Sequence, residues 1–308
     1  MFFVLSGFLV GGSLLRAYKN ASWSWRSYLT HRLVRLWIVL IPALLIGLLW
    51  DMLTIHIGKA SVNPAVMHRV AATVASLNLS TFFANLGFLQ RTLTPEFGSN
   101  GALWSLNNEF WYYVMFPLGF FALVPRYNDL LRVFFATALA ILLPVLGHAL
   151  VLAGPIWLIG VLLFYLPKST FSETQRRVAM GIYVVAFLAL KEVSFQFPLA
   201  TDYLLGVATC AMLWVILSDR SAAVPTRRSD GIRLLAKFSY TLYLIHIPIF
   251  TFVGVCLVKG QPWQPTFPHL ACAFGVWLAT ILFAFAIASV TEFHTDTVRR
   301  SVERWAGW

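Results

Sequence analysis

The chain has 308 residues, of which 59% are hydrophobic and only 11% are charged. Soluble domains carry about 25% charged residues, so this composition excludes a soluble globular protein. The formal net charge of +11 is explained first by the positive-inside rule for membrane proteins, and only second by nucleic-acid binding. The apolar runs are unbroken and too long for the alternating strands of a membrane β-barrel, which leaves an all-α, polytopic membrane helix bundle.

The chain opens on an apolar run from Phe2 to Leu15, which is shorter than the ~20 residues of a membrane span. No basic segment precedes this run, so it is not a cleavable signal peptide. We therefore expect the chain to begin inside a helix. Ser6 and Gly7 within the run indicate close packing between helices through small residues.

Further apolar runs follow along the chain, separated by basic or turn-forming segments. Counting the opening run, they predict about nine spanning helices. The expected spans cover residues 2–15, 33–50, 104–123, 131–150, 152–166, 178–191, 201–218, 237–258 and 270–291.

Residues 70–89 are apolar enough to suggest one more span, but charge argues against it. If they cross the membrane, the Arg-rich loops fall on opposite faces. If they do not, most basic residues lie on one side, and the other side keeps only Lys59, Arg69, Arg91, Lys191 and Lys259. The positive-inside rule favours the second arrangement. We therefore expect a re-entrant or non-spanning segment near 70–89 and a cytoplasmic C-terminus.

Glu109 is the only acidic residue that this reading places clearly within a span, and a charge at membrane depth indicates function. Ser105 lies four residues earlier, hence on the same helix face. The pair can orient a sugar, and Glu109 can act as a base or orient one. Trp104 and Tyr112 fit sugar stacking or an interfacial aromatic belt. Ser105 alone also fits a helix cap or an interhelical hydrogen bond.

A polar stripe runs along the span at 237–258. Polar side chains recur there at steps of three or four residues, at Ser239, Tyr240, Tyr243 and His246. This spacing predicts hydroxyls and an imidazole on one helix face, directed toward the bundle interior. Histidine is the usual proton shuttle near neutral pH. A structural histidine with a satisfied hydrogen bond is the alternative.

Arg32 and Arg35 lie three residues apart at a helix end, next to His31. Guanidinium groups bind phosphates, and coenzyme A carries several. The alternative is a topology signal that contacts lipid head groups. The three cysteines lie in apolar runs, and neither they nor the histidines show the spacing of a metal site, so no metal is expected.

Four motifs occur in order along the chain. They are Phe2-Phe-Val-Leu-Ser-Gly-Phe-Leu9, Arg32-Leu-Val-Arg35, Trp104-Ser-Leu-x-x-Glu109-x-x-Tyr112 followed by Phe116-Pro117, and Phe238-Ser-Tyr-Thr-Leu-Tyr-Leu-Ile-His-Ile-Pro248. Together they resemble the acyltransferase-3 family of bacterial integral-membrane O-acyltransferases that act on cell-envelope sugars.

The resemblance implies one transmembrane acyltransferase-like domain over residues 1–308, with ten helices in the family and the first one missing here. It implies transfer of an acyl group, often acetyl, from cytoplasmic acyl-CoA to a hydroxyl of an envelope polysaccharide or glycolipid at the bacterial inner membrane. Acyl-CoA is then a co-substrate, and no bound cofactor is expected. Relatives carry an Arg and a His, the favoured catalytic residue, on the missing helix, and no residue of this chain matches them.

We therefore expect the following roles. Glu109 is the catalytic candidate, with His246 in support. The acceptor contacts Trp104, Ser105, Tyr112, Tyr240 and Tyr243, while acyl-CoA contacts Arg32, Arg35 and His31. Membrane lipids are the other expected partners, and nucleic acid is not one.

Two other functions stay open at this point. The chain can be a truncated, inactive family member. It can also be a polytopic transporter or flippase, although the first half does not repeat the second as many transporters do.

Overall fold

The computed structural model describes all residues except 62, 168, 219–226, 260, 262 and 308. Helices dominate, and the described residues form no strand. The helices fall into two compact units, each built from two stretches of the chain. The first unit comprises Met1–Trp23 and Asn108–Val224, and the second comprises Ser24–Asn107 and Pro225–Trp308. Helix α6 (Leu103–Leu123) begins in the second unit and continues into the first.

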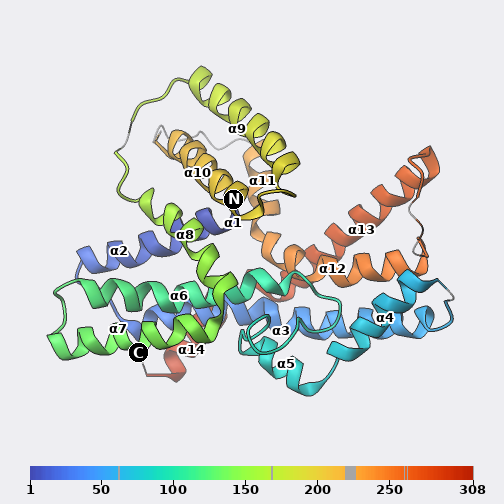
Figure 1. The fold of residues 1–308 in the computed structure, drawn as a ribbon, viewed down its shortest axis with the longest axis horizontal. Helices are drawn as coiled ribbons and strands as arrows, with labels where there is room; N and C mark the ends of the chain where they lie inside the picture. The colour runs from blue at the N-terminus through green and yellow to red at the C-terminus, as the bar shows by residue number, and fades with distance from the viewer. Residues whose placement is uncertain (62, 168, 219–226, 260, 262, 308) are drawn as a thin grey trace. The chain divides into compact units, whose positions relative to one another are not determined.

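The first unit is organised around α8. Its elements besides α6 are α1 (Phe2–Ser6), the π-helix η1 (Gly7–Gly11), α2 (Gly12–Lys19), α7 (Asp129–Leu146), α8 (His148–Leu162), α9 (Glu173–Val193) and α10 (Pro198–Leu217). The opening run packs against α8 (Figure 1). A Cβ atom added to Gly7 would lie 1.9 Å from the Trp157 carbonyl oxygen, and one added to Gly160 would lie 1.9 Å from that of Val4. The expected close packing through small residues is therefore confirmed.

The second unit is organised around α3. Its elements are α3 (Trp25–Gly58), α4 (Pro64–Ser76), α5 (Leu79–Leu86), α11 (Arg227–Lys237), α12 (Ser239–Cys256), α13 (Phe267–Val290), the short 3-10 helix η2 (Glu292–His294) and α14 (Thr295–Trp305). Helix α12 lies along α3, and α14 also packs against α3. At 1.5 Å per residue, the 34 residues of α3 extend about 51 Å. That length exceeds the ~30 Å hydrocarbon core of a membrane. The helix also extends beyond both ends of the predicted span at 33–50.

Residues 70–89 do not form one long helix. The segment divides at Leu77 into α4 and α5, of 13 and 8 residues. The Asn78 side chain accepts a hydrogen bond from the Thr81 amide (2.8 Å) and thereby starts the second helix. Each helix is shorter than the ~20 residues that a crossing requires.

Several helices of the described part are long and apolar enough to cross a membrane. Five meet that standard: α3, α7, α10, α12 and the continuous stretch Phe267–Trp305. Helix α8 is apolar but shorter. The polytopic helical membrane protein is thus confirmed in outline, while the count of nine spans stays a prediction. Helix α6 has a span's length, but its first turns carry Ser105, Asn107, Asn108 and Glu109.

A buried acid fixes the loop that precedes α6. Asp51 of α3 is 0% exposed, and its carboxylate accepts hydrogen bonds from the Ser99 amide (2.9 Å) and hydroxyl (2.5 Å). Gly98 approaches the same carboxylate so closely that a Cβ atom would lie 1.9 Å from Oδ2, and its φ of +63° also suits glycine. The loop before α6 is therefore held to α3 by these hydrogen bonds.

Replacing Asp51 with alanine is expected to lower the free energy of unfolding by about 1–3 kcal/mol, because the Ser99 donors then lack this acceptor. Thermal unfolding of the purified chain in detergent measures the loss. The control is Asp296→Ala, because this side chain is 76% exposed in its ion pair with Arg299, and exposed pairs contribute about 0–1 kcal/mol. Equal melting temperatures for Asp51→Ala and the unchanged protein would contradict the expectation.

Candidate functional site

Glu109 lies in a hydrogen-bonded cluster of the first unit. The residue is 8% exposed, and its Oε1 accepts hydrogen bonds from the Ser6 hydroxyl (3.3 Å) and from the Tyr113 hydroxyl. The Ser6 oxygen in turn accepts from the Trp157 indole nitrogen (3.2 Å). A buried carboxylate requires such partners. We call Ser6, Glu109, Tyr113 and Trp157 the Glu109 cluster; it joins α1, α6 and α8.

The aromatic side chains next to the Glu109 cluster border an apolar cavity. The ring of Trp157 lies 5.9 Å from that of Tyr112 and 5.1 Å from that of Phe116. These rings, with Gly119 and Gly154, line a cavity of about 460 Å³ between α6, α7 and α8. The Tyr112 hydroxyl, predicted to contact the acceptor, donates to the Leu150 carbonyl (2.8 Å). The cavity therefore suits a hydrocarbon group rather than a sugar.

A second polar group lies on α12 in the second unit. The Ser105 hydroxyl is 2.8 Å from the Tyr243 hydroxyl, so two residues predicted to bind the acceptor contact each other. Ser105 also donates to the Ala102 carbonyl (3.2 Å). Tyr240, on the same helix, places its hydroxyl 3.5 Å from the Leu36 carbonyl. The polar stripe of α12 thus contacts α6 through Tyr243 and α3 through Tyr240.

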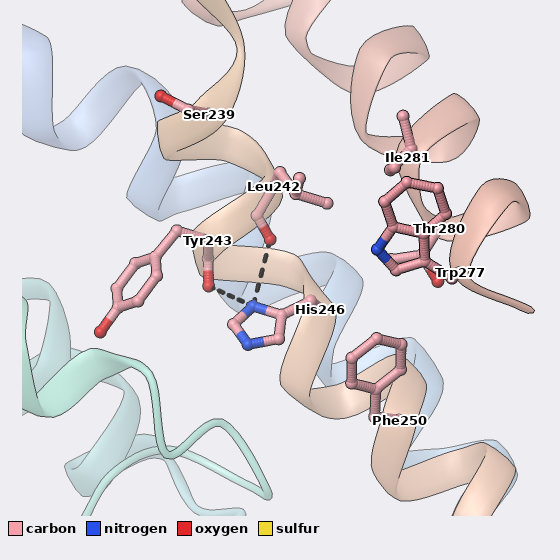
Figure 2. A pocket seen from close by; sticks show the side chains of 8 residues that line it. All are labelled: Ser239, Leu242, Tyr243, His246, Phe250, Trp277, Thr280 and Ile281. Atoms are coloured by element: carbon pink, nitrogen blue, oxygen red, sulfur yellow. Dashed lines mark hydrogen bonds between the residues drawn. The ribbon is translucent and has the colours of Figure 1, made fainter. Parts of the chain in front are cut away.

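His246 lines a cavity, and the contacts of one ring nitrogen define its tautomer. Its Nδ1 lies 2.7 Å from the Tyr243 carbonyl oxygen and 3.2 Å from that of Leu242 (Figure 2). Carbonyl oxygens only accept hydrogen bonds, so Nδ1 carries a proton and Nε2 has the lone pair in the neutral ring. No described residue forms a hydrogen bond with Nε2. This nitrogen is therefore set up to accept a proton.

The cavity that His246 faces lies between α12 and α13, and we call it the His246 pocket. It measures about 320 Å³. Its walls are Ser239, Leu242, Tyr243, His246, Phe250, Trp277, Thr280 and Ile281 (Figure 2). The imidazole and hydroxyls give this pocket the polar groups that the apolar cavity beside Trp157 lacks.

Asn100 supports the helical segment that carries His246. Pro248 has no backbone N–H, so it cannot bond the carbonyl of Leu244 four residues earlier. The Asn100 side chain donates to that carbonyl instead, at 2.8 Å. Ser99 of the same loop donates to Asp51 of α3. One loop therefore contacts α3 at Asp51 and α12 at the carbonyl that Pro248 cannot bond.

Charged groups near the N-terminal ends of α12 and α3 have hydrogen-bond, electrostatic or aromatic partners. Glu292 accepts hydrogen bonds from the Thr241 amide (3.0 Å) and hydroxyl (2.7 Å) and so caps the N-terminus of α12. Arg35 lies within electrostatic reach of Glu292. His31 Nε2 lies 2.8 Å from Glu303 of α14, and the Arg32 guanidinium lies 5.4 Å from the centre of the Tyr28 ring. The basic residues predicted to bind acyl-CoA therefore lie together on the first turns of α3.

A family model described as an acyltransferase domain, of the acyltransferase-3 type, matches residues 1–289. The chain belongs to the acyltransferase-3 family. The resemblance carried by the four motifs is thereby confirmed. No curated protein and no solved structure matches the chain.

Several residues that organise this acyltransferase were not predicted as site residues. Asp51 follows directly after a predicted span, and Ser6 was assigned to helix packing alone. Asn100 lies in a turn, but its position four residues before Trp104 could have marked it as a candidate site residue. Within the described residues, no group of three or more His, Cys, Asp or Glu side chains has an arrangement that can hold a metal ion.

The Asn100 contact predicts a specific coupling in the acyltransferase. Asn100→Ala is expected to destabilise the protein by about 1–3 kcal/mol, because the buried Leu244 carbonyl loses this donor. Pro248→Ala restores an N–H that can bind the same carbonyl. The loss caused by Asn100→Ala should therefore be smaller in the Pro248→Ala background. Thermal unfolding of the two single variants and the double variant measures this coupling, and additive losses would contradict it.

Proposed function

We propose that this acyltransferase moves an acyl group, acetyl in the simplest case, from cytoplasmic acyl-CoA to a hydroxyl of an envelope polysaccharide or glycolipid. Family membership supports acyl transfer in general. The observation that carries the chemistry is the His246 ring, whose protonated Nδ1 faces backbone carbonyls while Nε2 remains for a substrate proton. The apolar cavity beside Trp157 supports an acceptor with a lipid part.

The proposed reaction replaces a thioester by an oxygen ester. The acceptor hydroxyl attacks the thioester carbon, the C–O bond forms and the C–S bond breaks. The hydroxyl proton passes to a base, and the coenzyme A thiolate then takes up a proton, so the enzyme is unchanged. His246 Nε2 is one candidate base. Glu109 is the other, or it orients the acceptor hydroxyl, as its contacts with Ser6 and Tyr113 allow.

The donor's phosphates are proposed to bind at the first turns of α3. Arg32 and Arg35 lie one helical turn apart there, and their guanidinium groups can bind phosphate oxygens in pairs. His31 already contacts Glu303. Its proposed role is therefore to hold α14 next to Arg32 and Arg35, rather than to bind a phosphate itself.

Replacing either candidate base should reduce transfer. The assay reconstitutes the chain in liposomes with radiolabelled acetyl-CoA and envelope lipid and glycan, and it counts label covalently attached to the acceptor. General acid–base catalysis contributes about 10²–10⁴-fold, so His246→Gln or Glu109→Gln should reduce the transfer rate by that factor. His56→Gln and Glu192→Gln change the same residue types at exposed positions and should keep the rate.

The pattern of loss separates the alternatives. A loss in only one of the two variants names the base, and unchanged transfer in both removes both residues from the chemistry. Label that crosses the membrane without covalent attachment favours a transporter. No transfer by the unchanged chain, with folding intact, would overturn the proposed function.

The proposal also requires the loop at 87–102 to face the outside and the C-terminus to face the cytoplasm. Leu93 is 68% exposed in that loop, and Ser301 is exposed on α14. In a Cys272→Ser background, a membrane-impermeant maleimide added to intact cells should label Leu93→Cys. It should label Ser301→Cys only after the membrane is opened. The reverse pattern would place donor and acceptor on the wrong sides.

A further inference from the structure

A third cavity lies in the first unit, and it shares no residue with the Glu109 cluster or the His246 pocket. It measures about 360 Å³ and lies between α2, the end of α8 and the end of α10. One wall carries Arg16 and Lys19, and the others carry apolar and aromatic side chains that include Phe164, Leu166 and Trp214. We call it the Arg16 cavity.

The two cations of the Arg16 cavity face the same ring. Arg16 and Lys19 are three residues apart, hence on one side of α2. The Arg16 guanidinium carbon lies 5.9 Å from the centre of the Phe164 ring, and the Lys19 nitrogen lies 4.9 Å from it. Neither forms an ion pair with an acidic residue of the described chain. Two like charges at this spacing repel each other, so a bound anion would stabilise the arrangement.

The other walls limit what else the ligand can contain. The Trp214 indole nitrogen already donates to the Pro167 carbonyl (2.8 Å), and the Ser218 hydroxyl donates to the Trp214 carbonyl (2.7 Å). Few polar groups are left to recognise a sugar or a nucleobase. Leu166 and Leu217 also line the cavity. The ligand should therefore combine an anion with a hydrocarbon part.

We propose that the Arg16 cavity binds the head-group phosphate of an anionic phospholipid, with an acyl chain against Leu166 and Leu217. Arg16 supplies a planar donor fork for two phosphate oxygens, and Lys19 supplies a second positive charge. Basic pockets between membrane helices bind anionic head groups in this way. Coenzyme A shares the phosphate chemistry, but few free polar groups remain on these walls to recognise its nucleotide. The site does not depend on the acyl transfer proposed above.

The test compares the chain in nanodiscs of phosphatidylcholine with nanodiscs that also contain phosphatidylglycerol. A lipid that binds only the folded state raises the melting temperature, so phosphatidylglycerol should raise it for the unchanged chain. Arg16→Gln with Lys19→Gln should lose at least half of that rise. Native mass spectrometry should show at least tenfold weaker retention of phosphatidylglycerol by the same double variant.

The matched control removes two positive charges elsewhere. Arg300→Gln with Arg304→Gln changes exposed residues of α14 by the same net charge and should keep the rise. If the Arg16 and Lys19 double variant does not fold in phosphatidylcholine, Lys19→Gln alone is compared and should lose part of the rise.

Three results would overturn the proposal. The first is a rise that both double variants lose equally, which indicates a general charge effect. The second is stabilisation by coenzyme A, but not by phosphatidylglycerol, that the Arg16 and Lys19 variant loses. The third is the same stabilisation by inorganic phosphate in phosphatidylcholine discs, which indicates a free anion site.

Discussion

A polar group at membrane depth finds no water, so the protein itself must supply its partner. In this chain, three buried polar groups accept hydrogen bonds from residues remote in sequence. Ser6 donates to Glu109, Ser99 donates to Asp51, and Asn100 donates to the Leu244 carbonyl. The hydrogen bonds that make buried polarity tolerable are therefore also the bonds that hold distant segments together within each unit.

The same requirement shapes His246. Its Nδ1 donates to carbonyl oxygens of its own helix, so this half-buried imidazole has hydrogen-bond partners on one side of the ring only. The opposite nitrogen is left for chemistry, with its lone pair defined by the contact on the other side. Glu109 differs, because hydroxyl donors from two elements already converge on one of its oxygens. The environments of these two residues therefore suit proton transfer and orientation, respectively.

The sequence predicted what depends on local pattern. Most predicted spans coincide with helical structure, because long apolar runs favour helices wherever they pack, and Glu109 and His246 stand out as polar residues within such runs. The boundary between the predicted spans at 131–150 and 152–166 is wrong, because the chain leaves the helical conformation at Gly147 (φ +83°), between α7 and α8. The pairing of Ser6 with Trp157 and of Asn100 with Leu244 is tertiary, and no spacing along the chain encodes it. The length of α3 could not be predicted for a related reason. In the sequence Asp51 resembles the end of a span, whereas in the structure its carboxylate is buried and bonded to Ser99.

The π-helix at Gly7–Gly11 has a consequence for the surface beyond it. A π-turn accommodates one residue more than an α-turn, and each residue of an α-helix rotates its successor by about 100°. Every side chain after Gly11 is therefore turned by about that angle from where an uninterrupted α-helix would put it. The direction in which Arg16 and Lys19 point is thus decided five to eight residues upstream, in a glycine-bounded segment that carries no charge itself. Shortening that segment by one residue would rotate both cations off Phe164 without altering either of them.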